Sequence, residues 1–395
     1  MTMRIDPTFL YELKEYGEVD IEACFNCGNC TAVCSMTNSE DSFPRTLIRY
    51  TQLGLKEELV GSKELWLCYN CGECSETCPR QAEPAAFMMA ARNYAIASYD
   101  FTGLGRTLSS KPIFGGILLV LMNVVLFLFI YTYREPIPGG ELKLFEFLPY
   151  EFVHIAGIWM MVVVGILGLA VVINMISKVS RQAGLSAKSF FGKNAKSWWQ
   201  AIWEAVGRQA LGQKRYREDC EDEKVRKAWY LTKWFVHAAT IWGFLGLVLA
   251  TGLNYFLDII KIKATGTFVP IWHPIRLLGT IAGALMVYGV SVLIMRRLRK
   301  PDKAHSNSSF SDWVFLILLW VTGVTGFAVE LSLYLPEALW GYWLLLVHVA
   351  FSAELILLLP FSKFAHAILR TTALFVHALK PMPEEQMIEQ PAAAD

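Results

Sequence analysis

The sequence predicts an all-α fold, with a helical soluble head at the N-terminus followed by a bundle of six membrane-spanning helices. Hydrophobic residues make up 54% of the 395 positions, a high share for a soluble protein. Six apolar stretches reach the ~20 residues that a helix needs to cross a bilayer. The first hundred residues show helix signals and no period-2 alternation, so we expect helices there rather than a sheet.

The head, predicted over 1–105, contains two cysteine runs with the same C-x2-C-x2-C-x3-C spacing. The first run is Cys24, Cys27, Cys30 and Cys34, and the second is Cys68, Cys71, Cys74 and Cys78, followed by Pro79. A thiolate at every third position lets one tight turn present three sulfurs to a 4Fe-4S cluster, while the fourth cysteine reaches the other cluster. The runs therefore predict an alpha-helical ferredoxin-like domain with two 4Fe-4S clusters.

Crossed ligation assigns the cysteines to two sets. Cluster 1 would be bound by Cys24, Cys27, Cys30 and Cys78, and cluster 2 by Cys68, Cys71, Cys74 and Cys34. Structural zinc is the alternative, because paired cysteines also suit tetrahedral zinc. A disulfide framework fits the spacing poorly, and clustered thiols indicate a reducing compartment.

The net charge and the first residues indicate which partners and which compartment to expect. The formal net charge is +1, which offers no electrostatic basis for binding nucleic acid. The first twenty residues lack the apolar core of a signal peptide, so we expect the head to stay in the cytoplasm.

The membrane domain is predicted over 106–380, with a flexible tail over 381–395. Lys and Arg concentrate in 177–234 and just after the fourth span, and such residues mark the cytoplasmic side. The sequence thus predicts a multi-pass protein of the inner membrane, in contact with lipid, with its head and C-terminus in the cytoplasm. The six spans are expected near 113–132, 152–176, 235–257, 275–296, 312–334 and 340–364.

The loop 177–234 includes tryptophans and aliphatic residues at helical spacing, between Trp198 and Val206. This pattern predicts an amphipathic helix. Such a helix would lie at the level of the lipid headgroups or pack on the head or on a partner subunit.

Four histidines lie in or near the spans and are candidates for binding b-type haem, because imidazoles on facing helices hold haem in helical bundles. His348 and His366 are 18 residues apart, about 27 Å on one helix at ~1.5 Å per residue. This separation predicts two haems, although one remains an alternative. We expect His237 and His366 to bind the inner haem, and His348 and His154 the outer haem, with His273 as an alternative to His154.

Two carboxylates, Glu330 and Glu354, also fall within spans. Ionisable groups in a membrane are costly and often functional, so both are candidates for a proton relay, with structural pairing as the alternative.

The stretches CFNCGNCTAVC (24–34) and WLCYNCGECSETCPR (66–80) resemble the iron–sulfur subunit of heterodisulfide reductase. The membrane part resembles the cytochrome b subunit of that enzyme and, more distantly, the nitrate reductase gamma subunit. In the gamma pattern the span of His237 carries a second histidine, where this chain has Leu247. The two parts fused in one chain resemble the QmoC family, the membrane subunits of quinone-interacting membrane-bound oxidoreductases of sulfate-reducing bacteria.

The resemblance implies menaquinone as membrane substrate, QmoA- and QmoB-like flavin and iron–sulfur subunits as partners, and electrons destined for adenylylsulfate reductase. The expected function is therefore electron transfer between menaquinol and cytoplasmic subunits, with no hydride chemistry in this chain. One alternative is a subunit that serves a heterodisulfide or sulfite reductase. The other is a non-redox membrane protein with a zinc-bound head.

Overall fold

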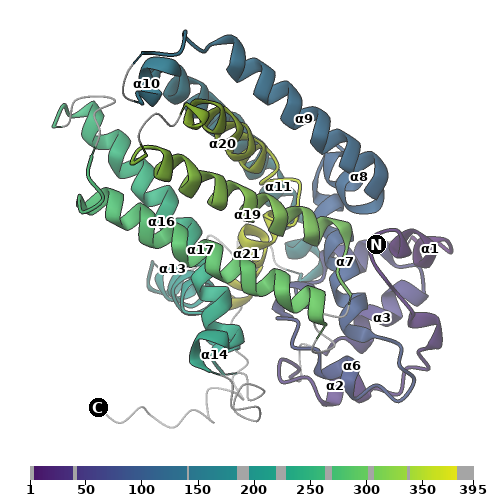
Figure 1. Ribbon diagram of the computed structural model, residues 1–395. Helices are drawn as coiled ribbons and strands as arrows, with labels where there is room; N and C mark the ends of the chain where they lie inside the picture. Colours follow the sequence, from purple (N-terminus) through teal and green to yellow (C-terminus); the bar gives the residue numbers. More distant parts are fainter. Residues whose placement is uncertain are drawn as a thin grey trace, which may run out of the picture.

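The structure, a computed structural model, describes residues 4–38, 42–139, 142–184, 195–218, 228–262, 269–300, 307–335 and 339–379. Within these ranges the chain forms helices and no strand, which confirms the predicted all-α class. The predicted tail 381–395 and parts of the loop 177–234 lie outside the described residues. Figure 1 shows the purple head beside one end of a bundle of long helices.

The head packs short helices around the long helix α7. Pro84 occupies the first turn of α7, where its missing N–H costs nothing. The side chains of Phe9, Leu47, Trp66 and Phe87 are at most 1% exposed and form the centre of the core. The head helices are α1 (Phe9–Lys14), η1 (Ile21–Ala23), α2 (Asn29–Ala32), α3 (Arg45–Gln52), α4 (Lys56–Gly61), α5 (Glu64–Leu67), α6 (Glu73–Glu76), α7 (Pro84–Tyr99) and α8 (Leu104–Ser110).

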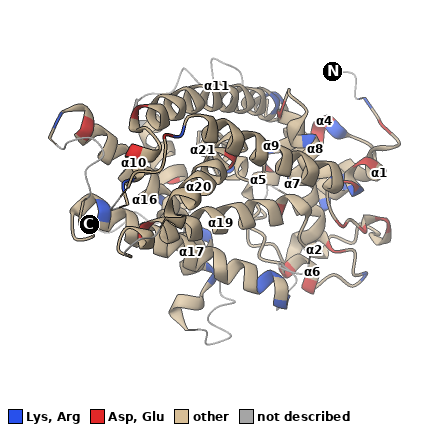
Figure 2. Cartoon of the chain, turned by 45° about the horizontal axis from the view of Figure 1, so that its top comes forward, with Lys and Arg blue, Asp and Glu red and all other residues tan. Residues whose placement is uncertain are grey.

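In the part of the chain that the structure describes, six helices are long and apolar enough to cross a membrane, as the sequence predicts. Figure 2 shows these helices largely free of charged residues, which lie mainly at helix ends and on the head. Because their outward surface is apolar, this bundle suits a lipid environment. The six are α9 (Pro112–Thr132), α11 (Tyr150–Gln182), α16 (Lys233–Ile259), α17 (Pro274–Arg299), α19 (Phe310–Ser332) and α20 (Trp340–Leu357). A short helix, α10 (Leu144–Phe147), lies at the end away from the head.

Helix α11 extends past the expected end of the second span, near residue 176, and joins the head. Its residues Val171, Met175 and Val179 are buried in the head core. The Asn174 side-chain amide donates to the Tyr99 carbonyl at 2.8 Å. Packing against α4 and α7 therefore stabilises α11 beyond the point where its apolar, lipid-facing residues end.

The sixth span ends earlier than expected. Helix α20 stops at Leu357, and a separate helix, α21 (Ala365–Ala378), follows a series of turns. Pro360 lies in that break and supplies no N–H for a continuing helix. His348 and His366 thus lie on different helices, and the separation expected along a single helix does not apply.

The loop after α11 packs within the chain and also exposes tryptophans. Helix α13 (Ala195–Ile202) continues into the π-helix η2 (Trp203–Leu211), and both pack against α21. Ala201 and Ala205 are buried, and the Trp198 ring lies 5.3 Å from that of Phe375. The side chains of Trp199 and Trp203 are exposed. Two further short helices, α14 (Lys214–Arg217) and η3 (Trp229–Leu231), precede α16.

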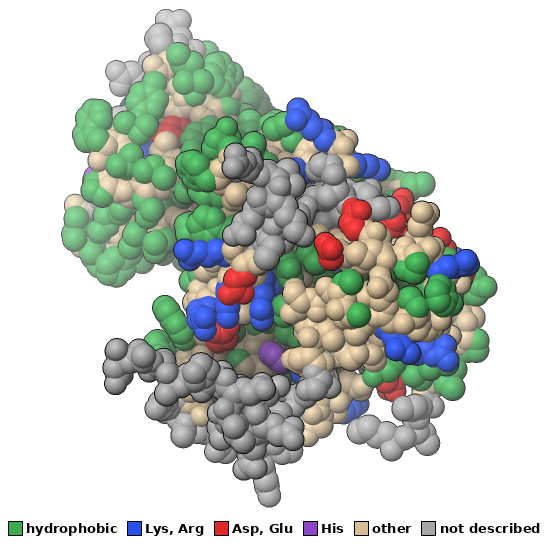
Figure 3. Space-filling view, turned by 90° about the horizontal axis from the view of Figure 1, so that it is seen from below, with side chains coloured by type: hydrophobic (Ala, Val, Ile, Leu, Met, Phe, Trp, Pro, Cys, Tyr) green, Lys and Arg blue, Asp and Glu red, His purple; other side chains and the backbone are tan. Residues whose placement is uncertain are grey.

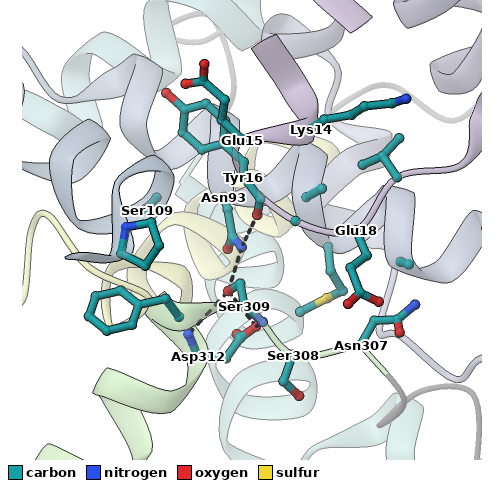
Figure 4. Close-up of a pocket in the computed structure, with 17 residues that line it drawn as sticks. Lys14, Glu15, Tyr16, Glu18, Asn93, Ser109, Asn307, Ser308, Ser309 and Asp312 are labelled. Carbon is teal, nitrogen blue, oxygen red and sulfur yellow. Dashed lines mark hydrogen bonds between the residues drawn. The ribbon is translucent and has the colours of Figure 1, made fainter. Parts of the chain in front are cut away.

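A polar network joins the head to the start of α19. The Asn93 side chain on α7 donates to the Tyr16 carbonyl at 3.2 Å and to the Ser309 hydroxyl at 3.1 Å. Ser309 caps α19 reciprocally with Asp312. This network lines a pocket of about 380 Å³ between the head and the spans. Figure 4 shows these hydrogen bonds running from the head to α19.

Helices α16 and α17 approach very closely. A Cβ atom added at Gly243 would lie 2.4 Å from the Met286 nitrogen and 2.6 Å from the Ala282 oxygen. Because these are backbone atoms of α17, no side-chain rotation relieves the clash. Small residues at such contacts let membrane helices pack backbone to backbone.

We expect Gly243→Ala to force α16 and α17 apart and to destabilise the protein by about 1–3 kcal/mol, the usual cost of overpacking. The measurement is the thermal unfolding midpoint in detergent. Gly252→Ala, on the same helix but with no atom within 4 Å of the added Cβ, is the matched control. Equal midpoints for the two variants would contradict the close packing.

Candidate redox site

The two cysteine runs adopt the same backbone conformation. Asn26 and Asn70 have φ angles of 59° and 61°, and Gly28 and Gly72 have φ angles of 89° and 94°. Glycine adopts positive φ without steric cost, and asparagine does so more readily than most residues. Each run adopts positive φ at two residues and then enters a one-turn helix, α2 or α6. The repeat in sequence is therefore a repeat in structure.

Backbone N–H groups point at the sulfur atoms. The N–H groups of Asn26 and Asn70 donate to the Sγ atoms of Cys24 and Cys68, both at 3.4 Å. A third N–H, at residue 82, donates to the Sγ of Cys78 at 3.4 Å. Hydrogen bonds to sulfur are among the factors that set the reduction potential of an iron–sulfur cluster.

One group of thiols, the first thiol set, comprises Cys24, Cys27, Cys30 and Cys78. Burial, together with smaller effects from the charges of the other three thiols in this set, raises the pKa of Cys30 to about 11. Cys78, from the second run, is thus among the thiols that interact with Cys30. Iron binding has to overcome this preference for the protonated thiol, since the metal binds the thiolate.

The other group, the second thiol set, comprises Cys34, Cys68, Cys71 and Cys74. Burial raises the pKa of Cys71 to about 11, with added effects from Cys68 and Cys34. Burial also raises the pKa of Cys74, and the charges of the other members of the set contribute, as does that of Cys30 from the first set. Each set contains three cysteines of one run and the last cysteine of the other. Four thiolates are the donors that a 4Fe-4S cluster requires, but no group of three or more Cys, His, Asp or Glu side chains in the described residues is arranged to hold a metal ion. Crossed ligation of two clusters by these sets stays a prediction.

The two runs are also tied to each other. The side-chain amide of Asn29, in α2, donates to the carbonyl of Thr77, next to Cys78, at 2.7 Å. Helix α2 packs against α6. This contact holds the last cysteine of the second run beside the first run.

His237 and His366, here called the inner histidine pair, lie near each other on α16 and α21. Burial holds the pKa of His366 well below its usual value, and the nearby charges of Arg92, Lys363 and Arg370 lower it further, as does His237. The His366 imidazole is therefore kept neutral, the form that binds a metal. Figure 3 shows Lys and Arg side chains gathered near the middle of the lower face.

Each imidazole of the inner histidine pair has a free nitrogen. The Nδ1 atoms of His237 and His366 are buried and have no hydrogen-bond partner within the described residues. A buried polar nitrogen without a partner is costly, so such an atom in a native protein requires an explanation. Neutral imidazole nitrogens are the donors that commonly bind a b-type haem, and the assignment of this pair to the inner haem stays a prediction.

The outer histidines have separate partners. The Nδ1 atom of His348 lies 3.0 Å from the Thr325 hydroxyl on α19. The His154 ring stacks on Tyr150 at 3.8 Å and on Tyr255 at 4.7 Å, and its Nδ1 lies 2.9 Å from the Tyr150 carbonyl. His273 is at the N-cap position of α17, at the end away from the head. The ligands of an outer haem stay a prediction.

The two intramembrane carboxylates differ in their contacts. Glu330 forms an ion pair with Arg276 at 3.2 Å and accepts from the Thr280 hydroxyl at 3.2 Å. Glu354 is 1% exposed, and its Oε2 accepts from the Asn123 amide at 2.7 Å. Its Oε1 has no partner within the part of the chain that the structure describes. Glu354 is thus the better candidate for carrying a proton, while the ion pair of Glu330 favours a structural role.

Sequence reasoning missed two arginines next to the second cysteine run. The Arg92 guanidinium donates to the carbonyls of Cys68 at 2.7 Å and Leu65 at 3.0 Å. Arg370 donates from Nε to the Trp66 carbonyl at 3.1 Å. Each arginine is the sole Lys, Arg, Asp or Glu in its helix, α7 or α21. An isolated charge in an apolar helix is the signal that would have identified them.

The membrane part decides the family. Residues 117–385, more than half of the chain, match the family model described as citrate utilization protein B. The chain belongs to the citrate utilization protein B family. The family member of Escherichia coli is 26% identical over 149 residues, covering 36% of this chain and 37% of that protein. No solved structure matches the chain.

The head of this citrate utilization protein B family member matches a second family model. Residues 20–82, which contain all eight cysteines of the two runs, match the 4Fe-4S dicluster domain. The chain is therefore an iron–sulfur protein, which favours clusters over zinc.

Relatives of the head are subunits of reductase complexes. The CoB--CoM heterodisulfide reductase iron-sulfur subunit of Methanopyrus kandleri is 37% identical over 99 residues, 23% of this chain and 52% of that protein. The corresponding subunit of the H(2):CoB-CoM heterodisulfide,ferredoxin reductase of Methanothermobacter thermautotrophicus is 36% identical over 91 residues, 23% of this chain and 49% of that protein. The chain thus spans about half the length of these relatives. The likeness supports an iron–sulfur electron-transfer subunit of a membrane redox complex.

Crossed ligation is tested by comparing serine variants. We expect Cys78→Ser to change the same electron paramagnetic resonance signal as Cys27→Ser, because both belong to the first thiol set. Cys71→Ser should change the other signal, and Cys34→Ser should match it. Each variant that loses its cluster should retain about four of about eight non-haem irons. If Cys78→Ser and Cys71→Ser change the same signal, the assignment is wrong.

Proposed function

We propose that this chain exchanges electrons between menaquinol or menaquinone and cytoplasmic partner subunits, through two b haems and two 4Fe-4S clusters. The observation that carries the proposal is the inner histidine pair, with its free nitrogens, placed against the cysteine-containing head. When bound, haem and clusters supply one-electron steps. The protein holds them in order and excludes water from the path.

At the quinone, the reaction has to move protons as well as electrons. Oxidation of menaquinol releases two electrons and two protons, whereas haems and clusters accept only electrons. Glu354, with one carboxylate oxygen uncommitted, would accept a proton within the membrane.

The proposed topology places the head, the loop 177–234 and the C-terminus in the cytoplasm of a cell with this chain in its inner membrane. Arg296, Arg297 and Arg299 end α17 on the side of the head, as the positive-inside rule requires. The domain division stays as proposed, with a head over 1–105 and a membrane part over 106–380. The head core, however, also includes residues of α11 and α21.

The partners proposed are QmoA- and QmoB-like flavin and iron–sulfur subunits, with electrons reaching adenylylsulfate reductase. This follows from the resemblance to the QmoC family, in which head and membrane part are fused. A second candidate function is electron transfer as a subunit of a heterodisulfide reductase complex. The likeness of the head to the iron–sulfur subunit of that enzyme favours it. The proteins that co-purify with the tagged chain from its own host would distinguish the two.

The deciding measurement is a visible spectrum of the purified chain with haem and iron quantified. We expect haem b bands that respond to a menaquinol analogue, and about eight non-haem irons for two cubane clusters. His237→Ala and His366→Ala should each abolish the inner haem, while His377→Ala, near the end of the same helix as His366, should retain it. Unchanged haem content in both test variants would refute the inner ligand pair. A colourless protein containing zinc would refute the function.

A further inference from the structure

The segment 66–69, here called the junction peptide, contains Cys68 and contacts the inner histidine pair on one side through Trp66. The Trp66 side chain is fully buried, and its ring stacks on that of His366 with centroids 6.0 Å apart and planes at 30°. Trp66 precedes Cys68 by two residues. The second thiol set is therefore joined to His366 by one aromatic side chain.

The junction peptide reaches the other histidine through Tyr216. The Tyr216 hydroxyl donates to the Tyr69 carbonyl at 3.0 Å, and the two tyrosine rings meet edge to face at 5.8 Å. The same Tyr216 ring lies 4.8 Å from that of His237. Both members of the inner histidine pair thus contact the junction peptide directly or through a single side chain.

Two arginines hold the junction peptide in place. Arg92 and Arg370 donate to its Cys68 and Trp66 carbonyls, from the head and from α21 respectively. Both positive charges lie near His366, and that of Arg370 also lies near His237 and Cys68. A positive charge stabilises a group that gains an electron, so both arginines favour electron entry at this point.

The first thiol set reaches solvent through Cys27, while its Cys30 is buried. Cys27 is exposed, and the neighbouring Phe25 is 60% exposed, with the Arg80 guanidinium 6.0 Å from its ring. The contacts of the Cys24 carbonyl and of Asn26 go to Gln52, within the head. The two thiol sets therefore have different surroundings. The first reaches solvent at Cys27, and the second adjoins the inner histidine pair through Trp66 and Tyr216.

We propose that the second thiol set holds the membrane-proximal cluster and the first thiol set the terminal cluster that a soluble redox partner reaches. Trp66 and Tyr216 are positioning residues that fix the distance from the second set to the inner histidine pair. The inference rests on the proposed function, because it requires a haem at that pair. In the quinol-oxidising direction, a haem held by the inner histidine pair would give up one electron, and a cluster held by the second thiol set would accept it. No proton moves and no side chain is oxidised.

The order is tested by the electron spin relaxation of the reduced clusters, measured in the full chain with the haem oxidised and with the haem reduced. The oxidised haem is paramagnetic, and we expect it to accelerate the relaxation of one cluster signal only. That signal should be the one that Cys71→Ser alters or removes, and Cys27→Ser should leave it in place. Assignment of the faster signal to Cys27 would reverse the order and overturn the proposal. Equal relaxation of both signals would also overturn it, whereas a chain without haem would refute the proposed function instead.

The role of Trp66 is tested with a pair of variants. Trp66→Leu should slow reoxidation of the haem through the clusters and weaken the relaxation effect, whereas Trp66→Phe should restore both. Haem content, iron content and helicity should equal those of the wild type in the variants compared. Phe101→Leu, an exposed aromatic residue of the head, is the control and should leave both readouts unchanged. Equal rates for Trp66→Leu and the wild type would show that Trp66 has no positioning role.

Discussion

The packing of α21 into the head core determines the arrangement of the whole redox site. Ala365, Leu369 and Ala373 of this helix are buried among the side chains of the head. The same helix carries His366 and Arg370, both of which contact Trp66. Because apolar burial holds α21 against the head, the histidine and the cysteine run keep a fixed relation. A chain in which the head was only tethered to the spans would lose that relation.

A buried ion pair secures the turn that leads into α21. Lys363 lies 3.1 Å from Asp312 at the start of α19, and both side chains are less than a tenth exposed. Lys363 also donates to the Asn93 side chain on α7 at 2.9 Å. Removing one partner of such a pair leaves an uncompensated charge, which is strongly destabilising. The network therefore fixes the relative positions of α7, α19 and the turns before α21.

The membrane bundle contributes a different kind of constraint. Its helices meet through small residues such as Gly243, which lies against the α17 backbone. Lipid tails are as apolar as the helix surfaces, so close backbone packing rather than hydrophobic burial orders the spans. That order sets which side chains of neighbouring spans meet, including the Glu354 contact with Asn123 between α20 and α9. The intramembrane polar groups depend on this packing for their partners.

From the amino-acid sequence alone, the all-helical class, the six membrane spans and the iron–sulfur head can be predicted. These features are local, because hydrophobic periodicity, span length and the repeated C-x2-C steps are read within about 20 residues. The sequence did not determine the end of α20, although Pro360 was a local signal for it. Three features appear only once the chain is folded: Trp66 meets His366, Arg92 donates to the Cys68 carbonyl, and Glu330 is paired. Within the described residues, one Glu354 oxygen has no partner. Such contacts join residues far apart in the chain, and packing rather than spacing brings them together.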